Sequence, residues 1–154
     1  MSLAEHTDWY SYEEYLSWPE GERVELIDGT PYAMSPAPRR EHQRMVSEIN
    51  RQLANALRGE PCEVYPAPFD VKLSPDTEDH RPTVVQPDLT VVCDPKKLTE
   101  HGMTGAPDLV IEIVSPDSGF HDRVWSEARF LLDHASRGAS SISTVTPVWG
   151  SIGS

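Results

Sequence analysis

The spacing of apolar residues predicts two helices in the first half of the chain. The clearer helix spans 41–58, where apolar positions recur at steps of three and four and therefore share one face. These positions are His42, Val46, Ile49, Leu53 and Leu57. Ser11 and Glu14 have the spacing of a capping box, which predicts a short helix over 12–17. A third helix is expected over 118–134.

Short apolar runs separated by turn residues predict several strands. Asp28-Gly29 is a strong two-residue hairpin signal between strands at 23–27 and 32–34. The other runs that predict strands are 63–65, 69–73, 84–93 and 109–114, with loops at 74–82 and 94–107.

The charge pattern changes near the C-terminus. Asp133 is the last acidic residue and Arg137 the last basic residue. From Ser136 onward the chain consists mostly of serine, glycine, threonine and apolar residues, without a convincing helix or strand pattern. We expect a single domain over 1–135, followed by a poorly ordered tail over 136–154.

Two carboxylates interrupt strands that are otherwise apolar. Glu112 lies in the run Leu-Val-Ile-Glu-Ile-Val, and Asp88 lies within 84–93. A carboxylate buried in a strand costs several kcal/mol unless a cation or hydrogen-bond donors compensate it. Two of them on neighbouring strands predict a site for a hard divalent cation, Mg²⁺ or Mn²⁺. The structural alternatives are an ion pair for Glu112 and a strand-entry role for Asp88.

Alternation of side chains along the Asp88 strand gives it two unlike faces. Asp88 shares one face with Gln86 and Thr90, whereas Leu89 and Val91 lie on the opposite face. We expect the apolar face to be the core face, and Asp88 to face a polar cleft.

Glu25 and His42 are further candidates for this site. Glu25 lies on the first strand of the hairpin, and His42 begins the apolar face of the long helix. Glu25 could equally be a surface carboxylate, and His42 a hydrogen-bonded core histidine. With the other two acids they would form a metal site that activates water and neutralises charge on a phosphate during in-line displacement.

Overall charge limits the predicted contact with nucleic acid. The chain has 25 acidic and 13 basic residues, a net charge of −12, whereas avid nucleic-acid binders are usually basic. Such contact would have to be local, weak or metal-assisted. The candidate contacts are Arg39 and Arg40, which precede the long helix, and Arg44 within it, and a solvated helix face is the alternative.

Cysteine content and hydropathy predict a cytosolic protein. No run approaches the roughly 18 apolar residues of a membrane span, and the N-terminus lacks a signal-peptide pattern. The two cysteines, Cys62 and Cys93, lie in apolar, strand-like surroundings. We expect them to be buried thiols rather than a disulfide or a zinc pair.

Several blocks of sequence resemble the Uma2 family of restriction-endonuclease-like proteins, formerly a domain of unknown function. The resemblance covers about residues 9 to 125, with the blocks in the family's order and spacing. The blocks are VELIDG at 24–29, MSPAP at 34–38, EHQR at 41–44, PCEVYPAPFDV at 61–71, VQPDLTV at 85–91 and GAPDLVIEIVSP at 105–116.

The resemblance implies an α/β, PD-(D/E)xK nuclease-like fold, with a mixed central sheet flanked by helices and the active site on its strands. In that fold Asp88 is the first acid and Glu112 the second, and both bind Mg²⁺. Glu25 would complete the metal shell, and His42 would line the site.

This chain departs from the family pattern at the active-site lysine. Val114 stands two residues after Glu112, and Ser126 stands where family members carry the lysine on the following helix. No lysine follows Lys97. From about Ser126 the sequence departs from the family's continuation, as a truncated or replaced segment would.

These features predict a cytosolic, Mg²⁺-dependent nuclease of the Uma2 type with low or lost activity. The alternative is a non-catalytic binding or assembly module with the same fold. A third interpretation is a small acidic enzyme that uses Glu112 and His42 for acid–base chemistry. Self-association as a homodimer is expected, because a domain that lacks its last strand exposes a sheet edge.

Overall fold

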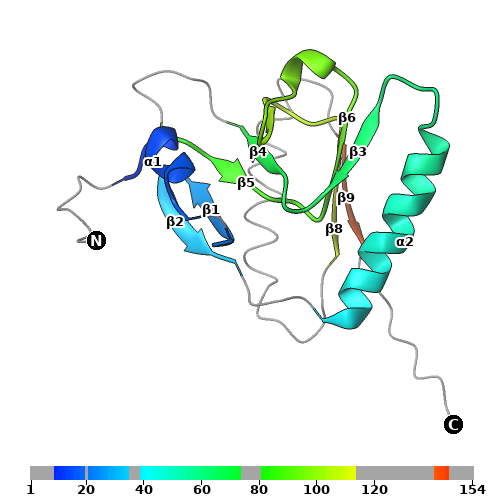
Figure 1. Ribbon diagram of the computed structural model, residues 1–154, viewed down its shortest axis with the longest axis horizontal. Coiled ribbons are helices and arrows are strands. Elements are labelled where there is room, and N and C mark those ends of the chain that lie inside the picture. Colours follow the sequence, from blue (N-terminus) through cyan, green and yellow to red (C-terminus); the bar gives the residue numbers. More distant parts are fainter. Residues whose placement is uncertain (1–8, 20, 35–38, 74–80, 114–140, 146–154) are drawn as a thin grey trace, which may run out of the picture.

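The strands of the protein form two sheets, with a helix beside each (Figure 1). The computed structural model describes residues 9–19, 21–34, 39–73, 81–113 and 141–145, the last range only as a strand. The prediction of an α/β fold with mixed sheets is confirmed, with the strands divided between two sheets.

The first sheet has five strands in the order β2-β1-β5-β4-β7. Neighbours are antiparallel except β4 and β7, which are parallel. The predicted hairpin is present, and its turn residues Asp28 and Gly29 both have positive φ, at 50° and 73°. The strands are β1 Val24–Ile27, β2 Thr30–Ala33, β4 Asp70–Lys72, β5 Val84–Val85 and β7 Gly102–Thr104.

The second sheet has four strands in the order β3-β6-β8-β9. The pairs β3·β6 and β6·β8 are antiparallel, whereas β8 and β9 are parallel. The strands are β3 Glu63–Pro66, β6 Leu89–Val92, β8 Leu109–Ile113 and β9 Ser141–Val145.

Both helices of the first half begin close to their predicted positions. Helix α1, Tyr12–Leu16, has both hydrogen bonds of the capping box between Ser11 and Glu14. Helix α2, Arg40–Ala56, packs against β3 and β8 with the apolar face that the sequence predicted. A short 3₁₀ helix, Pro95–Lys97, begins at Asp94, whose side chain accepts a hydrogen bond from the Lys96 N–H. The helix expected over 118–134 lies outside the described residues.

The hydrophobic core lies between the two sheets. Val71 and Met103 of the first sheet pack with Val92 and Val110 of the second, and all four are at most 2% exposed. Thr90 lies on the same side of β6 as Val92 and is fully buried. The expectation of one apolar and one polar face on this strand is therefore wrong, because the first sheet covers the face that carries Thr90.

Three predicted segments differ from the structure. The strand expected over 84–93 is divided into β5 and β6, which belong to different sheets. The break falls at Pro87, which has no N–H to donate to a sheet. The loop expected over 94–107 contains the 3₁₀ helix and β7. Part of the expected tail, Ser141–Val145, is a strand that pairs along β8, so this edge of β8 does not offer the free strand edge expected for self-association.

Cys62 and Cys93 form a disulfide, so the expectation of two free thiols is wrong. Glu63 of β3 lies opposite Val92 of β6, and the two cysteines are the next residues in this antiparallel register. The register, which the sequence does not show, brings them together. Among the described residues, no helix is long and apolar enough to cross a membrane.

Candidate metal and active site

Asp88 lies where the chain passes from β5 to β6, and it connects three elements. Its Oδ2 accepts a hydrogen bond from the Ile113 N–H of β8 at 2.8 Å and lies 3.2 Å from Nε2 of His42 on α2. The side chains of Asp88 and His42 are 15% and 19% exposed, so solvent reaches this pair. The structure therefore brings Asp88 to the strand that carries Glu112, and His42 to Asp88, whereas the roles of these residues stay a prediction.

Glu25 lies on β1 and is fully buried. Its Oε1 accepts a hydrogen bond from the Gln86 N–H at 2.8 Å, two residues before Asp88. Its Oε2 is buried and has no hydrogen-bond partner among the described residues. The alternative of a surface carboxylate is excluded, and a buried carboxylate oxygen without a donor calls for a cation or bound solvent.

Five further buried side-chain atoms have no hydrogen-bond partner among the described residues: Arg23 Nε, His42 Nδ1, Asn50 Oδ1, Gln86 Oε1 and Thr90 Oγ1. Of these side chains, that of His42 contacts Asp88, and that of Gln86 contacts Asp70. Buried polar groups in proteins are nearly always hydrogen-bonded, directly or through water. Two of the unpartnered atoms, Glu25 Oε2 and His42 Nδ1, belong to residues predicted for the site.

Glu112 lies on β8, is 9% exposed and immediately precedes the Ile113 N–H that binds Asp88. In the parallel pair it lies opposite Thr144 of β9. The described ranges contain no group of three His, Cys, Asp or Glu side chains that could hold a metal ion. Mg²⁺ commonly uses only one or two protein carboxylates and completes its shell with water and phosphate oxygens. The carboxylates of Asp88 and Glu25 fit such a partial shell in their chemistry.

A second polar cluster, between α1 and the first sheet, was not predicted from the sequence. Asp70 of β4 accepts hydrogen bonds on Oδ1 from the Tyr15 hydroxyl at 3.0 Å and from the Gln86 side-chain amide at 2.8 Å. Lys72, 4% exposed, places its Nζ 4.4 Å from the centre of the Tyr12 ring.

Burial determines the protonation of this second cluster. It raises the pKa of Tyr15 strongly, and the charge and hydrogen bond of Asp70 add to the effect. It lowers the pKa of Lys72. In the sequence, Asp70 and Lys72 flank the apolar Val71, as residues on the solvent face of an exposed strand would. Only the contact with α1 shows that they are buried.

The candidate arginines on α2 are exposed, and some of the positive charge on this helix is matched locally. Arg40 lies 3.4 Å from Glu41, and Arg51 binds Glu48 at 2.5 Å. Hydrogen bonds, first from Arg51, lower the pKa of Glu48 to about 2. A contact of Arg39, Arg40 and Arg44 with nucleic acid stays a prediction.

Comparison with known proteins places this architecture in a family. The chain is 30% identical over 115 residues to an uncharacterized protein of Synechocystis sp. strain PCC 6803, which covers 73% of this chain but only 57% of that protein's length. A crystal structure from Anabaena variabilis, titled as a "putative nuclease belonging to DUF820", matches 88% of this chain and 73% of its own, with a TM-score of 0.66 and 23% identity. Residues 12–128 match the family model Uma2, described as "Putative restriction endonuclease". The chain therefore belongs to the Uma2 family.

Proposed function

We propose that this chain is a nuclease-type hydrolase that cleaves phosphodiesters with a divalent cation, Mg²⁺ or Mn²⁺. The observation that carries the proposal is the arrangement at Asp88, whose carboxylate is held by β8 and His42. The buried Glu25, which is bonded to Gln86 two residues before Asp88, has an oxygen without a partner among the described residues. Membership of a family described as restriction endonucleases supports the same chemistry.

The protein's own residues would orient the site. Ile113 and His42 hold one oxygen of Asp88 and leave its other oxygen to bind the cation, which would supply charge neutralisation and an activated water. Glu25 would contribute its Oε2 to the same cation, directly or through water. Glu112 would be the second strand acid, as the family resemblance implies.

The rate is expected to be low, because the sequence has no lysine after Lys97 to assist the attacking water. General acid–base catalysis typically contributes about 10²- to 10⁴-fold, so its loss would leave a residual rate. Nicking of supercoiled plasmid in Mg²⁺ or Mn²⁺ tests this for the wild type, Asp88→Ala and Glu112→Ala, with exposed Glu60→Ala as the matched control. Metal-dependent nicking should vanish in the two site variants and persist in the control. Equal nicking in all four proteins would refute the assignment.

The alternative proposal is a non-catalytic binding or assembly module that keeps the nuclease fold. The net charge of −12 and the missing lysine favour it. Calorimetric titration with Mn²⁺ distinguishes the two proposals. A heat of binding that the substitution Asp88→Ala abolishes supports the metal site, whereas no heat of binding in the wild type supports the module. Sedimentation of the intact chain tests the expected self-association.

A further inference from the structure

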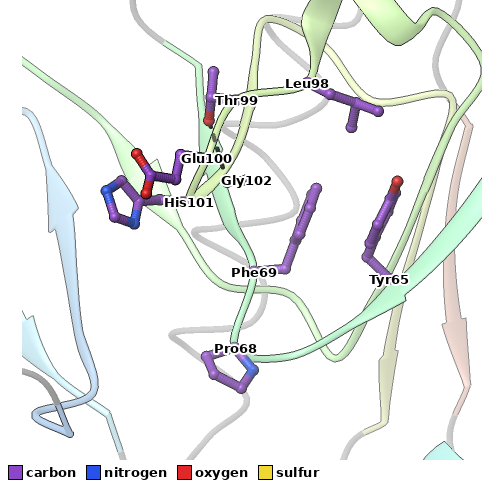
Figure 2. A pocket seen from close by; sticks show the side chains of 8 residues that line it. All are labelled: Tyr65, Pro68, Phe69, Leu98, Thr99, Glu100, His101 and Gly102. Carbon is purple, nitrogen blue, oxygen red and sulfur yellow. Dashed lines mark hydrogen bonds between the residues drawn. The ribbon is translucent and has the colours of Figure 1, made fainter.

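A pocket of about 310 Å³ opens beside the second polar cluster, outside the Asp88 site (Figure 2). Its apolar lining consists of Tyr65, Phe69, Pro68 and Leu98, and the turn 99–102 forms the opposite wall. Its volume is at the lower end of the range for ligand pockets, which suits a single ring system rather than an extended ligand.

The rings of Tyr65 and Phe69 are stacked, with centroids 4.5 Å apart and planes 8° from parallel. Both rings also pack against the hydrophobic core, so their positions are set before any ligand arrives. A hydrogen bond to Glu63 raises the pKa of Tyr65 to about 12. A preorganised aromatic face binds another planar ring with little loss of conformational entropy.

The turn opposite the rings is held rigidly by its own hydrogen bonds. Thr99 N–H donates to the Gly102 carbonyl at 2.8 Å, and Gly102 N–H donates to the Thr99 hydroxyl at 3.1 Å. A Cβ at Gly102 would lie 1.9 Å from the Asp70 carbonyl oxygen, so glycine is required here. Figure 2 shows the side chains of Glu100 and His101 pointing away from Phe69, which leaves the space beside the ring open.

The pocket is joined to the Asp88 site through the backbone. Ala67 N–H donates to the Asp88 carbonyl at 3.0 Å, and Pro68, the next residue, lines the pocket. Tyr65 lies opposite Thr90 in the β3·β6 register, two residues from Asp88. Strand β3 and the residues after it therefore connect the pocket with the segment at Asp88 where β6 begins.

We propose that this pocket binds one unpaired nucleobase of the substrate strand by stacking on Phe69. The proposal rests on the nuclease function above and explains how a chain of net charge −12 could hold a polyanion. Stacking is independent of the phosphate charge, and every base offers an aromatic face, so binding would be tolerant of sequence. The base must be unpaired, because bases in a duplex are covered on both faces.

Fluorescence anisotropy of a labelled oligothymidylate in EDTA tests the pocket without any cleavage. Phe69→Leu keeps an apolar side chain but removes the ring face, and should weaken binding about tenfold or more. Tyr32→Leu, which removes an exposed tyrosine on β2, is the matched control and should bind like the wild type. An abasic oligonucleotide of the same length should bind the wild-type protein more weakly, which tests the same point without a mutation.

The proposal is overturned if the wild type does not bind the oligothymidylate, if Phe69→Leu binds like the wild type, or if the abasic strand binds equally. Its failure is distinguishable from failure of the nuclease assignment. Binding is measured in EDTA without cleavage, whereas the nuclease assignment is tested separately by nicking in Mg²⁺ or Mn²⁺. If binding depends on Phe69 but the protein shows no metal-dependent nicking, the pocket proposal stands and the nuclease assignment fails.

Discussion

Two buried or nearly buried aspartates have opposite surroundings in this protein. Asp70 lies on β4 and is 9% exposed. Its side chain faces α1 and accepts hydrogen bonds from Tyr15 and Gln86. Asp88 is reached by solvent, and its neighbour His42 has a buried ring nitrogen, Nδ1, without a partner in the described part of the chain. Two side chains donate to Asp70, whereas Asp88 accepts from one backbone N–H and contacts His42 where solvent reaches the pair. The first arrangement is typical of a structural charge, and the second of a binding site.

Gln86 connects the two clusters. Its side-chain amide donates to Asp70, and its backbone N–H donates to Glu25. The residue is followed by Pro87 and then Asp88, so the closed cluster sets the position of the chain that leads into the open one. The enclosed aspartate thus supports the candidate site without belonging to it.

The largest expected difference between the two aspartates is in stability. Asp70→Ala leaves the Tyr15 hydroxyl and the Gln86 amide without their acceptor, and should lower the free energy of unfolding by about 2–4 kcal/mol. Asp88→Ala removes the acceptor of one backbone N–H at a solvated site, and should cost about 1–2 kcal/mol. Urea denaturation of both variants beside the wild type measures this. Equal losses would mean that the two clusters do not differ as described.

A smaller effect is expected in alkaline solution. Burial and Asp70 raise the pKa of Tyr15 above its ordinary value of 10.0, so the folded state holds this proton more tightly than the unfolded state. This contribution to stability is complete below pH 10 and is lost as the pH rises through the pKa of the folded state. Between about pH 8 and about pH 11, Tyr15→Phe should lose less stability than the wild type. Parallel losses in the two proteins would contradict the assigned environment of Tyr15.

The smallest expected effect concerns the cation–π contact between the Tyr12 ring and the Lys72 ammonium group. Tyr12→Leu retains an apolar side chain but removes the cation–π contact, and should cost about 1 kcal/mol in unfolding free energy. Tyr32→Leu, at an exposed position of β2, should cost less. Thermal or urea unfolding of this pair provides the measurement, and a larger loss for Tyr32 would argue against the contact.

Local signals in the sequence predicted the elements that depend on local chemistry. The capping box at Ser11, the Asp28-Gly29 turn and the period of α2 each act over a few residues, and all three are present. Strand β9 has no such local signal, because it forms by pairing with β8, which is distant in the sequence. The division between β5 and β6 likewise depends on which sheet each half can join, although Pro87 marks the place.

The candidate acids were found because a carboxylate among apolar residues is unusual in any fold. This argument identified Glu112 and Asp88 and placed Asp88 beside the strand of Glu112, as the bond to Ile113 shows. It missed Asp70 and Lys72, whose alternation with apolar neighbours resembles an exposed strand face. Only the docking of α1 buries them, and docking is a contact between residues more than fifty positions apart.

By itself, therefore, the sequence determined the hairpin and the approximate bounds of α1 and α2, because these follow from short-range pattern. The family resemblance implied the α/β class, and the cost of burying charge identified candidate acids whose role stays a prediction. The tertiary structure alone decided the two-sheet arrangement, the Cys62–Cys93 disulfide and the contrast between Asp70 and Asp88. Each of these depends on which distant segment supplies a hydrogen-bond donor or covers a face, and that information resides in the register and packing of the strands rather than in any local run of residues.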